Sequence, residues 1–299
     1  MRGGDPVVPV VVVHWNRLER CVATVARFHD QGVPVAITVV DNGSPAPVRR
    51  ALRELLPADV EMLELGANRG FGPAANAGFR RWLARRDAGE WGGDWLALAP
   101  HDALAAPGCL DRMLAVLAAR PRAGLACADY GDGATPVVDP YFGGILAPAT
   151  VAEGWEPAGH PHGTLLMARA ACLDEIGLFD ERYFAYCEEA DLGLRARAGG
   201  WEVGLVRGAL VRNPDVGSAV AAVDYLQLRN TLLLVREHWG RYHATIRFLL
   251  ALAQLGTGLV APARRGPYWS VTGRLRALAD FTRGRFGPPP EALFAHTGG

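Results

Sequence analysis

The sequence contains no lysine and carries no excess of either charge. All 31 of its basic residues are arginine, a bias that a GC-rich genome produces, and 31 acidic residues balance them. A neutral chain with a pI near 7.1 lacks the basic footprint of nucleic-acid-binding proteins. We therefore expect no nucleic-acid partner.

Cysteines and long apolar runs are also scarce. Five cysteines are scattered over 299 residues without a C-x-x-C pair, which excludes a disulfide framework or a zinc ribbon and fits a reducing cytosol. The first apolar run, residues 7–13, has the length of a strand rather than of a signal peptide. No run reaches the roughly 20 apolar residues of a membrane span. These shortages predict a cytoplasmic protein that can bury its core without disulfides or structural metal.

What the chain does contain is an alternation of strand and helix patterns. Residues 7–13 are mostly valine without polar alternation, which is typical of a strand buried on both faces of a parallel sheet. Helical spacing covers residues 18–29, and the alternation continues through strand, helix, strand, helix and strand over residues 35–40, 48–56, 60–65, 73–86 and 95–99. This order predicts a doubly wound α/β sheet, in which ligands bind at the carboxyl ends of the strands.

The remainder divides into an irregular middle and a helical end. Residues 121–161 predict short strands and loops. After them we expect strands at 164–168, 203–206 and 209–211, and helices at 171–176, 188–199, 225–239 and 244–260. The predicted domains are an α/β unit over residues 1–222, dividing near residue 105, and a helical region over residues 223–299.

Polar residues follow two of the predicted strands. Asp41 ends one strand before Asn-Gly-Ser, where it would either contact a nucleotide or cap an Asx-turn. Asn68 and Arg69 lie in a glycine-rich loop before a helix, which suits a diphosphate but equally suits a tight turn. The loop contains G-x-G-x-x-A from Gly70, a poor match to the dinucleotide fingerprint because Gly70 lies five residues beyond the strand.

Acidic residues mark two further positions. Asp102 follows a strand, where it would either bind a divalent cation that neutralises phosphate or cap a turn. Glu188, Glu189 and Asp191 open a helix, where clustered acids are commonly solvated caps. Crowded carboxyls also raise one another's pKa, which suits a general base near neutral pH.

In this order the motifs resemble glycosyltransferase family 2, and within it the rhamnosyltransferase-like subgroup. The resemblance covers roughly residues 7–240 and rests on VVVHWNR ending at Arg17, VVDNGS ending at Ser44, NRGFG ending at Gly72 with NAG at 76–78, GLFDERYFAYCEEADL at 177–192 and LRN at 228–230. It implies a GT-A fold, a Rossmann-like mixed sheet with flanking helices, followed by a C-terminal helical extension. Residues 1–105 would then be the nucleotide-binding half and 106–222 the acceptor half of a catalytic domain.

The resemblance also implies the reaction and the roles of single residues. A sugar would move with inversion from a nucleotide-diphosphate donor to a glycan, lipid-linked or small-molecule acceptor, with Mg²⁺ or Mn²⁺ as cofactor. The assigned roles are nucleoside binding for His14, Asn16 and Asp41, a place near the donor for Asn68 and Arg69, metal binding for Asp102, and catalytic base for Glu189 with Glu188 and Asp191 shaping its environment.

The chain departs from the family pattern at three positions. The metal motif reads Pro100-His101-Asp102, so His101 is a second candidate ligand in place of a further acid. Arg212 stands where the family often has a histidine, and would contact the diphosphate directly. The base position is Glu rather than the commoner Asp, which lengthens its reach by one methylene.

We predict a cytosolic inverting glycosyltransferase that uses a dTDP- or UDP-sugar, with L-rhamnose or another hexose transferred. The alternatives are an NAD(P)-dependent oxidoreductase using the Gly70 loop, and a catalytically silent nucleotide-binding protein of the same fold. Arginines flank the apolar stretch 248–260, namely Arg236, Arg241, Arg247, Arg264 and Arg265. This pattern predicts peripheral contact with the inner face of the membrane, or else a helix packed on the catalytic domain or in a homodimer.

Overall fold

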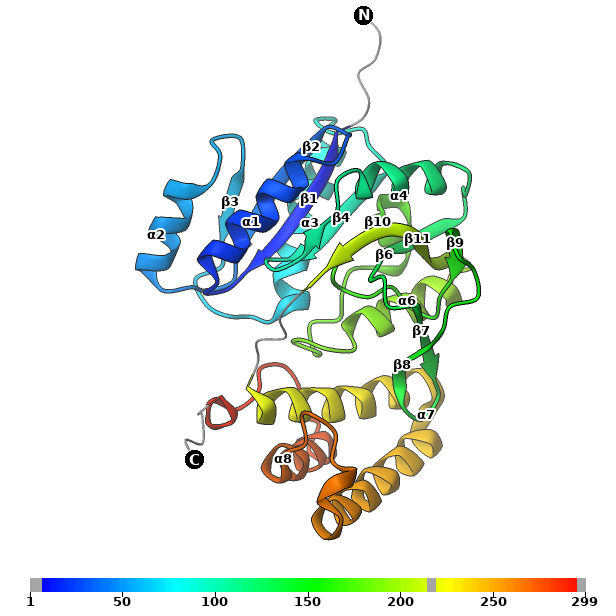
Figure 1. Cartoon of the computed structure of the whole chain (residues 1–299). Coiled ribbons are helices and arrows are strands. Elements are labelled where there is room, and N and C mark those ends of the chain that lie inside the picture. Colours follow the sequence, from blue (N-terminus) through cyan, green and yellow to red (C-terminus); the bar gives the residue numbers. More distant parts are fainter. Residues whose placement is uncertain (1–6, 214–218, 295–299) are drawn as a thin grey trace, which may run out of the picture.

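The computed structural model describes residues 7–213 and 219–294. Figure 1 shows a twisted sheet with helices on both faces, and a layer of C-terminal helices beyond one edge of it. The sheet has nine strands, with eight in the order β3-β2-β1-β4-β10-β6-β11-β5 and β9 pairing with β11. This is the mixed α/β sheet that the sequence predicted.

The amino-terminal half of the sheet is parallel. Its strands are β1 (Val8–His14), β2 (Val35–Asp41), β3 (Glu61–Glu64) and β4 (Trp95–Pro100). All seven residues of β1 are buried, as its uninterrupted apolar pattern predicted. His14 is in register with Asp41, so the polar residues that end these strands meet at one edge of the sheet.

Two hydrophobic cores cover the faces of the sheet. Helices α1 (Leu18–His29) and α4 (Cys109–Ala118) pack on the face with Val10 and Val12. The face with Val11 and Val13 packs on α3 (Phe71–Asp87), α5 (Ala170–Ile176) and α6 (Glu188–Ala198). Helix α2 (Ala46–Leu55) contributes Leu52 to the first core. Of these helices, only α4 was not predicted from the sequence.

The rest of the sheet is mixed. Strand β10 (Leu166–Arg169) runs antiparallel to β4 and β6 (Ala123–Asp129), and β11 (Glu202–Arg212) runs parallel to β6. The two short strands expected over residues 203–211 form the single strand β11, because a register shift between Val206 and Leu210 lets pairing continue. The short strands β5 (Leu104–Ala105) and β9 (Gly154–Pro157) pair with β11.

The C-terminal layer is helical, as predicted. It contains α7 (Val220–Val260), α8 (Val271–Thr282) and the 3₁₀ turns η1 (Pro262–Arg264) and η2 (Glu291–Leu293). Gly240 has non-helical angles, which divides α7 at the point where two separate helices were expected. By length and composition α7 is apolar enough to cross a membrane, and 28% of its most apolar window is buried.

A β-hairpin bridges the sheet and these helices. Strands β7 (Ala134–Asp139) and β8 (Gly143–Pro148) pair with each other and reach down to α7 in Figure 1. At the turn of the hairpin, the ring of Tyr141 lies 5.2 Å from that of His243 on α7. The hairpin, the start of α6 and the C-terminal helices therefore enclose a common space.

Candidate active site

The polar ends of β1 and β2 form a hydrogen-bonded floor, in which His14 Nε2 is buried with no partner among the described residues. His14 Nδ1 lies 3.0 Å from Asp41 Oδ1 and both side chains are fully buried, while the Ser44 amide donates to Asp41 Oδ2 at 3.1 Å. Burial alone would raise the pKa of Asp41, but the hydrogen bonds from His14 and Ser44 outweigh it and lower the pKa. Asp41 is thus a fixed buried anion. Asn16, exposed and with φ of 59°, directs the chain over this floor.

The glycine-rich loop before α3 is held by a pair of asparagines. Asn42 Nδ2 donates to Asn68 Oδ1 and to the Gly70 carbonyl, both at 3.0 Å, and Asn42 Oδ1 accepts the Arg69 amide at 2.8 Å. A Cβ on Gly70 would lie 2.2 Å from the Phe184 carbonyl oxygen, and its φ is +99°. This backbone approach requires glycine at position 70. The Arg69 side chain is exposed.

A small pocket opens between this floor and the loop before α6. It has a volume of about 170 Å³, and we call it the strand-end pocket; its walls include Trp15, Asn42, Asn68, His101, Phe184 and Tyr186. The structure therefore brings the predicted residues Asn68 and His101 together. The predicted residues that do not line the pocket are His14, Asn16, Asp41, Arg69, Asp102 and Arg212.

The candidate metal residues are at the end of β4. The His101 ring packs edge-on against His14 with 5.7 Å between centroids, and its pKa is lowered to about 4 by burial and by the charge of His14. Asp102 Oδ1 accepts a hydrogen bond from Asn213 Nδ2 at 3.1 Å. Over residues 7–213 and 219–294, no three His, Cys, Asp or Glu side chains converge as a metal site. A single carboxylate such as Asp102 still fits a cation whose other ligands are phosphate oxygens and water.

Arg212 ends β11 with an exposed side chain. Its backbone is paired with Leu104 of β5. Residues 214–218, which follow it, lie outside the described residues. The predicted contact between Arg212 and a diphosphate therefore stays a prediction.

Two adjacent carboxyl groups open α6. Glu188 is 2% exposed and its Oε2 has no hydrogen-bond partner among the described residues. Burial and the charge of Glu189 raise the pKa of Glu188 well above its ordinary value. Burial also raises the pKa of Glu189, to about 6, although a hydrogen bond with Glu188 opposes the rise. With a pKa of about 6, Glu189 is ionised at neutral pH, which is the state that a general base requires.

Asp191 has a different role from the two glutamates. Its Oδ2 accepts from Arg195 Nε and its Oδ1 lies next to His238 Nε2 of α7, both at 2.8 Å. Residues three or four positions apart share one face of a helix, so Asp191 and Arg195 lie together while Glu189 points elsewhere. Asp191 therefore joins α6 to α7, and it does not line the cavity that contains Glu189.

The segment before α6 has a strained backbone that one asparagine holds in place. Phe184, Tyr186 and Cys187 all have positive φ, which is unfavourable for residues with a side chain. The buried Asn230 Nδ2 lies 2.7 Å from the carbonyls of Tyr183 and Ala185 and 2.8 Å from that of Tyr186. The LRN motif at 228–230 thus fixes this loop. From the sequence we had interpreted the motif only as the start of the helices.

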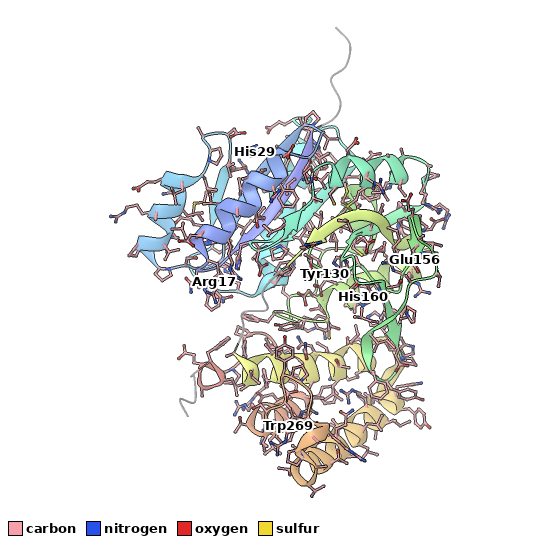
Figure 2. The ribbon with its side chains drawn as sticks, viewed as in Figure 1. Arg17, His29, Tyr130, Glu156, His160 and Trp269 are labelled. Carbon is pink, nitrogen blue, oxygen red and sulfur yellow. The ribbon has the colours of Figure 1, made fainter. Side chains whose placement is uncertain are left out.

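The second cavity, which we call the Glu189 cavity, has a volume of about 400 Å³. Figure 2 places His160, one of its wall residues, between the sheet and the C-terminal helices. Its other walls are the β7–β8 hairpin, the start of α6 and the two long C-terminal helices, including Phe142, Ile145, Leu146, Tyr186, Asp224, Gln227, Arg247 and Arg274. Tyr186 lines both cavities, so the loop fixed by Asn230 separates them.

Sequence reasoning did not place Asp224, Arg247 or Arg274 at a site. These residues come from helices that follow the domain with the recognisable motifs, and a helical pattern gives no indication of which neighbour its polar residues face. An arginine inside an apolar helical stretch, as at Arg247, was the available signal. From the sequence we had assigned it to the flank of a membrane-facing helix.

Comparison with known proteins identifies relatives of this chain. The family model "Glycosyl transferase family 2" matches residues 7–159. The chain is 32% identical over 227 residues to N-acetylglucosaminyl-diphospho-decaprenol L-rhamnosyltransferase of Mycobacterium tuberculosis, in strains CDC 1551 and H37Rv. The match covers 65% of this chain and 72% of the relative.

Solved structures share the fold at low identity. The mannosyltransferase PcManGT from Pyrobaculum calidifontis, in complex with GDP-Man and Mn²⁺, matches with a TM-score of 0.56 and 16% identity over 94% of this chain and 87% of the other. GalNAc-T7 with UDP, GalNAc and Mn²⁺ matches with a TM-score of 0.59 and 15% identity over 93% and 54%. The fold is therefore that of GT-A glycosyltransferases.

Proposed function

Since the chain belongs to glycosyl transferase family 2, a family of nucleotide-sugar glycosyltransferases, we propose that it transfers L-rhamnose from dTDP-L-rhamnose to a lipid-linked glycan with inversion. The choice of sugar and acceptor is supported by the L-rhamnosyltransferase that shares 32% of its residues over 227 positions. The structural observation that carries the proposal is Glu189, which lines a cavity next to the strand-end pocket and has a pKa raised to about 6 by burial.

The reaction needs one base and no covalent intermediate. The acceptor hydroxyl gives its proton to the Glu189 carboxylate, and the resulting oxygen attacks the anomeric carbon on the face opposite the nucleotide. The bond between the anomeric carbon and the diphosphate oxygen breaks as the new bond forms, so the configuration inverts. Burial and the charge of Glu189 raise the pKa of Glu188, which favours the neutral form of that carboxyl beside the base.

The donor occupies the strand-end pocket in this proposal. Asn42, Asn68 and the Trp15 ring line the space for the nucleoside, and the buried pair of Asp41 and His14 holds the strand ends beside it. The exposed side chains of Asn16, Arg69 and Arg212 contact the donor from outside the pocket. Arginine suits positions 69 and 212 because a guanidinium pairs with two phosphate oxygens at once.

We assign a divalent cation, Mg²⁺ or Mn²⁺, to Asp102 rather than to His101, whose ring packs on His14. Two structural neighbours contain Mn²⁺, which supports the use of a cation by this fold. When bound between Asp102 and the donor phosphates, the cation would offset the charge that develops on the leaving diphosphate.

The second half of α7 supports contact with a membrane. Its exposed apolar residues include Leu249, Leu252, Leu259 and Val260, and Leu275 on α8 is also exposed. A helix with such a face lies flat at the surface of a bilayer, where a lipid-linked acceptor is located. We therefore propose a cytoplasmic enzyme bound peripherally to the inner face of the membrane.

Transfer assays with a panel of donors test this function. We expect rhamnosylated product with dTDP-L-rhamnose, and an anomeric configuration by NMR that is opposite to that of the donor. Binding of NAD(P), measured as a rise in Tm, would favour the oxidoreductase alternative. Nucleotide binding without turnover on any glycan or lipid-linked acceptor would favour a silent binding protein.

A further inference from the structure

The Glu189 cavity contains a buried arginine that forms no ion pair with the part of the chain that the structure describes. Arg247 is 8% exposed, and its Nε has no hydrogen-bond partner among the described residues. Its Nη1 makes a long hydrogen bond of 3.4 Å to Gln254, and its guanidinium lies 5.6 Å from the centroid of the Phe142 ring. Burial and the charge of Arg274 lower the pKa of Arg247 to about 10, so the group is still charged at neutral pH.

Two other buried arginines show what this chain does when such a charge is structural. Arg207, 3% exposed, is paired with Glu156 at 2.5 Å and with Asp129 at 3.0 Å. Arg229, fully buried, donates to Asn230, to the Tyr225 hydroxyl and to two main-chain carbonyls. A buried charge without partners is strongly destabilising. Arg247 is therefore a buried cation whose anionic partner a bound ligand would supply.

The neighbours of Arg247 narrow the kind of ligand. Arg274 also lines the cavity, and within residues 7–213 and 219–294 its guanidinium donates through Nε alone, to Asp224 at 2.9 Å. Asp224 is occupied by this bond and by the Ser270 amide at 2.6 Å. On the hairpin side, three apolar wall residues are exposed, Phe142 by 44%, Ile145 by 41% and Leu146 by 67%. The cavity thus combines two guanidinium groups, the carboxyl groups of Glu189 and Asp224, and an apolar rim.

We propose that Arg247 and Arg274 bind a phosphate or diphosphate group of the acceptor. The acceptor sugar then reaches Glu189, and the apolar chain attached to the phosphate leaves over Phe142, Ile145 and Leu146. The diphosphate of the donor is not this anion, because Arg247 lines the Glu189 cavity and not the strand-end pocket. The inference rests on the proposed function for the identity of the sugar, but not for the binding of the anion.

The first test compares two acceptors that carry the same sugar, one linked through a diphosphate to a lipid and one an alkyl glycoside without phosphate. In R247M we expect kcat/KM for the diphosphate acceptor to fall about 10- to 100-fold, the effect of losing a charge-assisted bidentate contact. The value for the alkyl glycoside stays unchanged. R283M, which removes an exposed arginine at the end of α8, leaves both values unchanged. An equal loss on both acceptors, or no loss on the diphosphate acceptor, would overturn the inference.

The second test needs no turnover and therefore separates this inference from the proposed function. With the strand-end pocket saturated by dTDP and no metal present, inorganic pyrophosphate binds the wild-type chain in calorimetry, and R247M weakens that binding at least tenfold. R247K keeps the positive charge but loses the paired N–H donors of the guanidinium, so we expect an intermediate loss of affinity. It replaces R247M as the test variant if R247M does not fold. Absence of pyrophosphate binding to the wild type contradicts the proposal. So does a reduced affinity of R247M for anionic vesicles without acceptor, because Arg247 would then bind membrane headgroups.

Discussion

The strand-end pocket and the Glu189 cavity are neighbours that differ in how their polar groups are satisfied. Beside the pocket, Asp41 accepts hydrogen bonds from His14 and Ser44, and on its wall Asn42 donates to Asn68. One atom there, His14 Nε2, is buried with no partner among the described residues. In the wall of the cavity, Arg247 Nε is buried without a partner among the described residues, and so is Oε2 of Glu188, the neighbour in sequence of the wall residue Glu189. The strand ends and the loop beside the pocket are thus held mainly by their own hydrogen bonds, whereas the guanidinium of Arg247 in the cavity is not paired with a carboxylate of the described residues.

The largest expected effect is on the cavity side. Glu189→Gln keeps the shape of the base but cannot accept a proton, so transfer falls about 10²- to 10⁴-fold. Binding of dTDP, measured by calorimetry, is unchanged because the strand-end pocket is intact. Glu188→Gln is the matched control and keeps transfer within a few-fold, since the raised pKa of Glu188 favours its neutral form. A larger loss in Glu188→Gln than in Glu189→Gln would move the base to the other carboxyl.

On the pocket side, Gly70→Ala should be the most damaging change. The new Cβ would meet the Phe184 carbonyl at 2.2 Å, so the loop must move and dTDP binding weakens strongly. Gly66→Ala is the control, because Gly66 also has a positive φ of +75° but has no neighbour within 4 Å. In Gly66→Ala, the free energy of unfolding should fall only by the cost of placing a side chain at a positive φ, about 1–2 kcal/mol. Equal effects would mean that the close approach at Gly70 is unimportant.

A substitution that loosens the loop between the two cavities should have a smaller effect, and it should affect both cavities. Asn230→Ala removes the donor shared by three carbonyls, which should lower the free energy of unfolding by about 1–3 kcal/mol. Because Tyr186 lines both cavities, kcat and the KM for each substrate should change together. A loss of Tm with unchanged kinetics would show that Asn230 supports folding but not the site.

The smallest effect is expected at the candidate cation ligand. Asp102→Asn should weaken dTDP binding about tenfold in Mn²⁺, comparable to the loss of one ligand contact to the metal, and should not change it in EDTA. Calorimetry with and without Mn²⁺ gives both values. The same loss under both conditions would show that Asp102 acts without a cation.

The comparison also explains what the sequence could predict. The pocket is built from motifs that each follow a strand, so Asp41, Asn68 and His101 could be placed at one sheet edge from the apolar pattern alone. The pattern did not indicate that His14 would cover Asp41 and complete its hydrogen bonding, because the register of β1 against β2 brings them together.

The Glu189 cavity could be predicted only in part. The acids at 188–191 identified the start of α6, but a linear motif does not state which of them faces solvent, partner or cavity. Asp191 was expected to shape the environment of the base. Its carboxylate bonds Arg195 and His238, which the motif did not indicate, and its influence on Glu189 stays a prediction. Arg247 reaches the site because α7 bends at Gly240 and runs past the hairpin, which is tertiary packing that local periodicity does not encode.

The most direct measurement of the central claim, that ionised Glu189 deprotonates the acceptor, is the pH dependence of kcat/KM for rhamnosyl transfer. A carboxyl whose pKa is raised to about 6 is protonated below that pH and cannot act as a base. We predict that the rate falls tenfold per pH unit below about pH 6 and is constant above it, and that Glu189→Gln abolishes this limb. A profile of the wild type that is flat from pH 5 to pH 7.5 would contradict the account.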